Sequence, residues 1–195
     1  MVTREAAEGL MQGAGGALRG RAVLAGAGIV AAAHPLAAAA GLEQLQAGGN
    51  AMDAALAASA VCNVVLPLSC GLGGDTFFLY PEAASGRTYG LNSSGIAPAA
   101  ATREEYLRRG YVKMPFYGPL SIGVPGAVDA YAVAAERFAS RPLAALFRRA
   151  VAYARDGFPL TPAVARGIAG ASEELLKYPA SAATYLPGGS PPLPG

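Results

Sequence analysis

The stretch SCGLGGDTFFLY (residues 69–80) places three glycines before an aromatic run, and the order of its parts decides how the chain is interpreted. A phosphate-binding loop needs a strand, then glycines, then a helix whose N-terminal amides face the anion. Here a helical stretch precedes the glycines, a strand-like run follows them, and Asp75 would repel a phosphate. A nucleotide-binding module is therefore the least favoured of the three hypotheses for this chain, the other two of which are given below. The glycines instead predict a sharp turn that lets other backbone pack close to the strand.

Two alanine-rich helices are predicted ahead of this turn. Residues 27–33 predict a buried strand, and Pro35 suits the first turn of the helix that follows it. Gly48 and Gly49 end this helix, and Asn50 can cap a second one. The second helix is apolar nearly all round, so it is expected at the centre of the fold. The expected apolar stripe of the first helix consists of Leu36, Ala39, Ala40, Leu42 and Leu45.

A hairpin and further helices are predicted after the turn. Residues 76–80 and 87–93 have the composition of two strands joined by a short turn. Thr102, with Glu105 three residues later, has the spacing of a capping box and opens a short helix. Prolines followed by apolar residues at helical spacing predict the remaining helices. These helices are expected to begin at Pro125-Gly126, Pro142 and Thr161-Pro162.

Several side chains are interpreted as structural. His34 is expected to be a hydrogen-bonded residue rather than a catalyst. Asp53 lies on an apolar helix and needs a hydrogen-bond partner or a wet edge, so it is interpreted as support for the glycine-rich turn. Cys62 and Cys70, with one histidine, cannot complete a closed zinc site, and neither a metal nor a cofactor is predicted. The aromatic side chains expected in the core are Phe77, Phe78, Tyr80 and Tyr89.

Composition limits the classes of protein. The chain has 195 residues, 53% of them hydrophobic and 14% charged, which is typical of one globular domain and excludes a disordered chain. A net charge of +2 without a basic block indicates no nucleic-acid partner. The apolar region of residues 22–40 is broken by His34-Pro35, so no membrane span is predicted. The N-terminus lacks the layout of a signal peptide, which predicts a cytoplasmic protein.

Residues 34–80 (HPLAAAAGLEQLQAGGNAMDAALAASAVCNVVLPLSCGLGGDTFFLY) resemble the start of the large subunit of the gamma-glutamyltranspeptidase family. The resemblance covers nearly all of the chain from about Ala27 onward, with its segments in order and similarly spaced. The other matching segments are GLNSSGIAPAAAT (90–102), GPLSIGVPGAVDAY (118–131), RAVAYARDGFPLTP (149–162) and YLPGGSPPLPG (185–195).

The resemblance implies an α+β fold, as part of the four-layer αββα sandwich of N-terminal-nucleophile hydrolases. Residues 1–195 are then a single incomplete domain, with 1–26 as a poorly ordered extension and 27–195 as the large-subunit-like segment. In the family a precursor cleaves itself to free a threonine, whose hydroxyl attacks an amide carbonyl with its own amine as base. The implied substrate is a small-molecule amide or peptide, and the implied partner is the small subunit of the same precursor.

The same resemblance bears on which residues act. The family's nucleophile begins the small subunit, and Thr76, Thr102 and Thr161 do not match its motif, so no catalytic residue is predicted within this chain. Ser94 and Gly95 are predicted as substrate-binding residues, because they stand where transpeptidases carry an Arg-Glu pair.

That arginine holds the α-carboxylate of the γ-glutamyl group through two parallel hydrogen bonds. Asp75 and the SSG segment are more similar to the branch of cephalosporin acylases and oxamate amidohydrolase, which often has an arginine where this chain has Ile96. Without either arginine, γ-glutamyl specificity is not expected and the acyl group stays open.

Two hypotheses follow for the chain as a whole. It is either the front part of a self-processing amide-cleaving enzyme, inactive by itself, or a scaffold or interaction protein that kept the fold and lost the chemistry. The tail, residues 185–195, contains four prolines and three glycines and predicts a loop with nothing after it to anchor it. The chain is therefore expected to continue beyond this loop.

Overall fold

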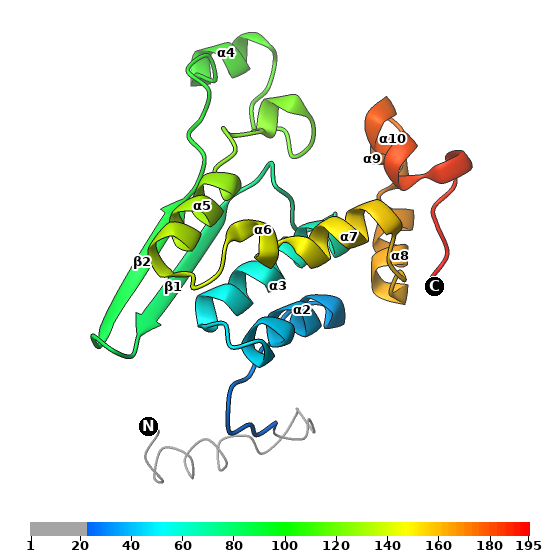
Figure 1. The fold of residues 1–195 in the computed structure, drawn as a ribbon. Helices are drawn as coiled ribbons and strands as arrows, with labels where there is room; N and C mark the ends of the chain where they lie inside the picture. The colour runs from blue at the N-terminus through cyan, green and yellow to red at the C-terminus, as the bar shows by residue number, and fades with distance from the viewer. Residues whose placement is uncertain (1–22) are drawn as a thin grey trace, which may run out of the picture.

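The computed structural model describes residues 23–195. Residues 1–22 of the predicted extension at 1–26 therefore lie outside the described residues. The described residues form one hairpin of two antiparallel strands, β1 (Thr76–Glu82) and β2 (Arg87–Ser93), which lies at one side of a group of helices (Figure 1). The α-helices are α2 (Pro35–Gln46), α3 (Ala51–Val65), α4 (Arg103–Arg108), α5 (Ala127–Phe138), α6 (Leu143–Leu146), α7 (Arg148–Asp156), α8 (Pro162–Gly170), α9 (Ser172–Leu175) and α10 (Pro179–Tyr185). Two short 3₁₀ helices are η1 (Pro119–Ser121) and η2 (Pro187–Gly189).

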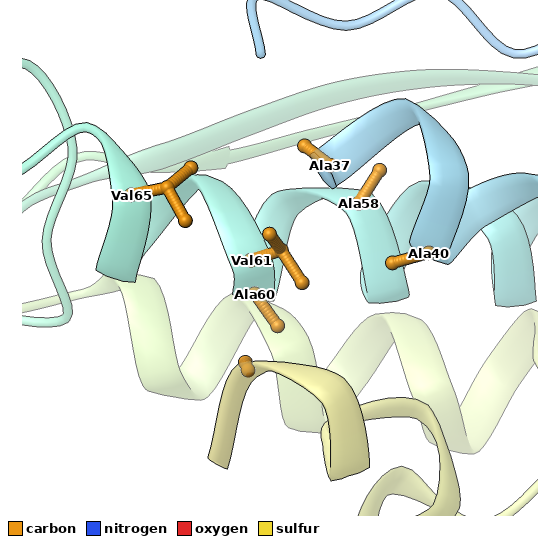
Figure 2. Packing of buried hydrophobic residues seen from close by; sticks show 7 residues of the cluster. Ala37, Ala40, Ala58, Ala60, Val61 and Val65 are labelled. Atoms are coloured by element: carbon orange, nitrogen blue, oxygen red, sulfur yellow. The ribbon is translucent and has the colours of Figure 1, made fainter. Parts of the chain in front are cut away.

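Helix α3 is central, as its composition predicted, and packs against α2, α5, α6 and α7 (Figure 1). Small side chains fill the contacts, and Figure 2 shows Ala37 of α2 beside Ala58 of α3. The approach is close enough that a Cβ atom on Gly41 would lie 2.9 Å from the carbonyl oxygen of Ala54. Short side chains therefore set the spacing of α2 and α3. The buried residues of this cluster are Ala37, Ala40, Ala58, Ala60, Val61, Val65 and Ala150.

Helix α5 covers one face of the hairpin. Its last residue, Phe138, packs against Phe78 of β1 at a ring-centroid distance of 6.2 Å, against Tyr80 at 4.8 Å and against Tyr89 of β2 at 5.0 Å. Tyr131 of α5 is buried in the same cluster with residues of α3 and α6. The predicted hairpin is confirmed, with Thr76 paired to Ser93 at its open end.

The expected strand at residues 27–33 is wrong. These residues form no strand, and most of them are exposed. The two strands of the described sheet pair only with each other, so this segment has no neighbour to satisfy its backbone hydrogen bonds. A short apolar run predicts burial but does not identify a partner strand.

Three predicted core assignments, Ala39, Leu42 and Phe77, are also wrong, because these residues are exposed. Leu42 is 43% exposed, because the buried face of α2 is made of its small residues and Gln44 rather than its leucines. Phe77 is 61% exposed, because side chains alternate along a strand and Phe78 and Tyr80 take the face toward α5. Phe78, Tyr80 and Tyr89 are partly buried, as expected of core aromatics.

The tail is bound to an earlier part of the chain. The amide of Leu160 donates to the carbonyl of Gly195 at 3.2 Å, and the amide of Gly195 donates to the carbonyl of Leu160 at 3.1 Å. Leu186 is buried against Val164 and Ile168 of α8. The proline-rich segment thus returns along the chain, a contact that its composition could not predict.

Candidate substrate-binding site

Three chain segments meet beside the glycine-rich turn. The carbonyl of Gly74 accepts hydrogen bonds from the amides of Gly126 and Ala127 at 3.1 and 3.0 Å, which ties the turn to the start of α5. The amide of Val124 donates to the carbonyl of Ile96 at 2.9 Å. The turn, the segment after β2 and the segment before α5 therefore form one connected wall.

Asp75 joins the turn to the segment after β2 by its side chain. One carboxylate oxygen, Oδ1, accepts from the amide of Gly95 at 2.9 Å, and the other, Oδ2, accepts from the hydroxyl of Ser94 at 3.3 Å. The amide of Ser94 donates to the side chain of Asn92 at 2.9 Å. The backbone of residues 94 and 95 is thus held by two different side chains.

Glycine is required at two positions of this wall. A Cβ atom at Gly95 would lie 1.8 Å from the carbonyl oxygen of Val124. A Cβ atom at Gly126 would lie 2.1 Å from the carbonyl oxygen of Ser93. Both distances are far below van der Waals contact, so any side chain there would force the segments apart.

The wall bounds an open hollow of about 870 Å³. Its opposite side is a lobe formed by residues 97–123, in which the buried Tyr106 of α4 donates its hydroxyl to the carbonyl of Leu120 at 2.5 Å. The charged side chains that line the hollow are Asp75, Arg103 and Lys113. The hollow is large enough for a drug-sized ligand and carries two cations against one carboxylate.

The two predicted substrate-binding residues lie differently in this hollow. Gly95 lines it, whereas Ser94 does not and donates its hydroxyl to Asp75. Sequence reasoning missed Arg103, Lys113 and Tyr106, which come from the lobe. The spacing of Thr102 and Glu105 predicted a helix there but gave no indication of which face the hollow would use.

A second, smaller hollow of about 270 Å³ lies behind the turn. Its lining includes Ser59, Asn63 and Tyr131. The side-chain amide of Asn63 donates to the hydroxyl of Tyr131 at 2.7 Å, and Ser59 Oγ lies 2.9 Å from the same oxygen. Cys70 also lines this hollow. The pKa of the nearby Cys62 thiol is raised, mainly by burial and to a smaller extent by Cys70. Cys62 is therefore held in its neutral, unreactive form.

Asp53 has the hydrogen-bond partners that were predicted, but it supports a different loop. Its carboxylate is fully buried and accepts from the amides of Asn50, Ser140 and Arg141 at 2.7, 3.0 and 3.2 Å, and from the hydroxyl of Ser140 at 2.5 Å. It therefore joins the start of α3 to the connection between α5 and α6, not to the glycine-rich turn. The predicted cap is confirmed, because Asn50 accepts in return from the amide of Asp53 at 2.9 Å.

His34 is structural, as predicted. It caps α2, with Nδ1 accepting from the amide of Leu36 at 3.2 Å. Burial lowers the pKa of this imidazole, so it is neutral near pH 7. Thr102 and Thr161 are also caps, since their hydroxyls accept from the amides of Glu105 and Val164, both at 3.3 Å.

Two negative findings concern the described residues alone. Between residues 23 and 195, no group of three or more His, Cys, Asp and Glu side chains is placed to hold a metal ion. Within the same range, no helix combines the length and the apolar character that crossing a bilayer requires.

Comparison with known proteins identifies the class to which this fold and wall belong. The family model described as Gamma-glutamyltranspeptidase matches residues 37–195. The chain is similar to the cephalosporin acylase from Bacillus halodurans, whose crystal structure superposes with a TM-score of 0.83 at 36% identity, over 93% of this chain and 35% of that one. This is an α+β fold of the N-terminal-nucleophile hydrolases, as the resemblance implied. The chain belongs to the gamma-glutamyltranspeptidase family.

Two curated relatives place it near the acylase branch. It is 36% identical over 178 residues to the acylase ACY 1 proenzyme of Pseudomonas sp. (strain SE83), and 37% identical over 177 residues to the oxamate amidohydrolase proenzyme of Klebsiella pneumoniae. Each match covers 86% of this chain and 32% of the relative. The chain thus spans about a third of the length of these relatives, and the predicted family and branch are confirmed.

Proposed function

We propose that this chain is the frame and one pocket wall of an amide hydrolase or acyltransferase whose precursor cleaves itself to free a catalytic threonine. The observation that carries the proposal is the hollow bounded by Gly95 and the glycine-rich turn, in a chain that belongs to this family. The threonine hydroxyl attacks an amide carbonyl with its α-amine as base, and water or an amine then takes the acyl group.

The nucleophile belongs to another part of the same precursor. Thr76, Thr102 and Thr161 do not match the nucleophile motif of the family, and Thr76 lies in the hairpin, paired with Ser93. Thr102 and Thr161 also use their hydroxyls as helix caps. The relatives' names, which call them proenzymes, support a processed precursor.

The single incomplete domain and the cytoplasmic location stay predictions.

The acyl group of the substrate carries a carboxylate, and the enzyme binds this carboxylate without the arginine that transpeptidases use. By the family resemblance, Ser94 and Gly95 stand where transpeptidases carry the Arg-Glu pair. The backbone of Val124 leaves no room for a side chain at position 95. Arg103 and Lys113, across the hollow, are the cations available to a carboxylate on the substrate. Substrates with a carboxylate placed for these two side chains are therefore favoured over γ-glutamyl compounds.

Self-cleavage is the first test. The complete polypeptide that carries these residues is purified and examined by mass spectrometry for two chains, the second beginning with threonine, and is assayed for amine release from a panel of carboxylated amides. We expect cleavage and hydrolysis of at least one amide. An intact polypeptide that hydrolyses none of them would favour the scaffold hypothesis.

Replacing Ser94 tests the pocket assignment. In the complete enzyme, Ser94→Arg is expected to give measurable glutathione hydrolysis, because a guanidinium can hold the α-carboxylate in two hydrogen bonds. Asp75 would compete for this cation, so the gain should be larger when Ser94→Arg is combined with Asp75→Asn. Ser94→Gln, which adds length without charge, is the control and should give no gain. No gain in either arginine variant would contradict the assignment.

A further inference from the structure

The carboxylate of Asp75 lies where the two hollows meet. Asp75 and Gly74 line both the hollow of about 870 Å³ and the smaller one behind the turn. The bonds of this carboxylate to Gly95 and Ser94 span 20 and 19 residues of sequence. The hairpin brings Asp75 and Ser94 side by side, since Thr76 pairs with Ser93 at its open end. The two oxygens of Asp75 extend this connection beyond the last strand pair, to the hydroxyl of Ser94 and the amide of Gly95.

We propose that Asp75 is the positioning residue of the substrate wall: its carboxylate fixes the backbone of Ser94 and Gly95 against the glycine-rich turn and so sets the shape of the larger hollow. The inference rests on the proposed function for its effect on catalysis, but not for its effect on the wall. Hydrogen bonds to a charged acceptor are stronger than neutral ones, which suits a carboxylate to this task.

Gly95 has few other ways to be held. It has no side chain, and the space of its missing Cβ atom is taken by the carbonyl of Val124 at 1.8 Å. Its amide has its partner in Asp75, at 2.9 Å. Loss of that partner frees the amide of a residue that both lines the hollow and lies against the segment before α5.

The same bonds define what Ser94 can do. Its hydroxyl proton is directed to Asp75, so the hydroxyl oxygen can accept a hydrogen bond but has no second proton to donate. Ser94 therefore contributes to selectivity through the shape of the wall. The positions of the backbone atoms in this wall determine which substrates fit. Asp75 acts on these positions through residues 94 and 95, and not on the substrate directly.

The test compares Asp75→Ala with Asp75→Asn in the complete enzyme. The amide oxygen of asparagine can still accept from Gly95, and its NH₂ can donate to the Ser94 hydroxyl, so this variant keeps the connection without the charge. The matched control is Glu82→Ala, which removes a carboxylate that accepts from the Ser85 hydroxyl in the hairpin turn, outside the lining of the larger hollow. Two readouts are needed: hydrogen exchange at the Gly95 amide, and kcat and KM for the best amide substrate.

For Asp75→Ala we expect exchange at Gly95 to accelerate about tenfold or more, and KM to rise about tenfold with kcat changed less. Asp75→Asn should restore most of both values, and Glu82→Ala should change neither. Unchanged exchange at Gly95 in Asp75→Ala would overturn the proposal. So would an Asp75→Asn variant that restores exchange but not KM, because the charge would then act on the substrate itself. Absence of hydrolysis in every variant, with the expected exchange pattern, would remove the proposed function and leave the positioning role intact.

Discussion

The helical core around α3 packs through small side chains, whereas the lobe of residues 97–123 leaves large apolar side chains in solvent. Ala37, Ala57 and Val61 have no exposed surface, while Val112 and Phe116 in the lobe are more than four-fifths exposed. The core is held by many short contacts, and the lobe by a few identifiable bonds, such as that of Tyr106 to Leu120. We therefore expect the core to be the more stable region and the lobe to be the more adaptable one.

From this difference between core and lobe, we predict that removing one buried group of the core lowers the free energy of unfolding more than removing any single group of the lobe. Asp53→Ala should lower the free energy of unfolding by about 3 kcal/mol, because it leaves several buried donors without an acceptor. Urea unfolding followed by circular dichroism measures it. The control is Asp129→Ala, an exposed acid in the first turn of α5, which should cost about 0.5 kcal/mol or less. Equal losses in the two variants would remove the distinction between buried network and surface charge.

In the lobe, Tyr106→Phe should cost about 1 kcal/mol, the typical contribution of one hydrogen bond. Hydrogen exchange should accelerate in residues 103–123 and stay unchanged in α2 and α3, because the lobe opens without the core. Tyr111→Phe is the control: its ring packs on Tyr106 at 6.4 Å, and its hydroxyl makes no hydrogen bond within residues 23–195. Faster exchange across both regions would mean that lobe and core unfold as one unit.

The smallest effect is expected at the surface of α4. Hydrogen bonds from Arg108, which have the larger effect, and from Arg109 lower the pKa of the Glu105 carboxyl to about 2. A carboxyl with a lowered pKa stabilises the folded state above its unfolded pKa of 4.5, and this contribution is lost as the pH falls through about 2. Because Arg108 and Arg109 are exposed at the protein surface, the effect on stability is small and weakens with salt. NMR titration of Glu105 checks it, with Arg108→Gln expected to raise the pKa, and a wild-type midpoint near 4.5 would show that the ion pairs do not form in solution.

Local chemistry explains what could be predicted from the sequence. Asn50, Thr102 and Thr161 cap their helices through bonds to residues three positions away, so the pattern and the contact lie in the same short segment. The hairpin is local for the same reason. Family resemblance placed residues 94 and 95 near a site, and the structure brings Gly95 to the hollow.

Contacts distant in sequence account for what was missed. Asp53 meets Ser140 across 87 residues and Gly195 meets Leu160 across the C-terminal helices, and neither pairing leaves a periodic pattern. The apolar run at 27–33 indicated burial because pattern reasoning assumes a neighbouring strand. Arg103 and Lys113 reach the hollow only through the path of the lobe, which no spacing rule encodes.

The proposed function depends most on a nucleophile that lies outside these residues. The most direct measurement treats the complete, processed protein with an electrophile that acylates reactive hydroxyls and thiols, then maps the modified residue by mass spectrometry. We expect one modified threonine, at a newly formed N-terminus and outside residues 1–195. Modification of a residue within the 195, with loss of amide hydrolysis, would contradict the account.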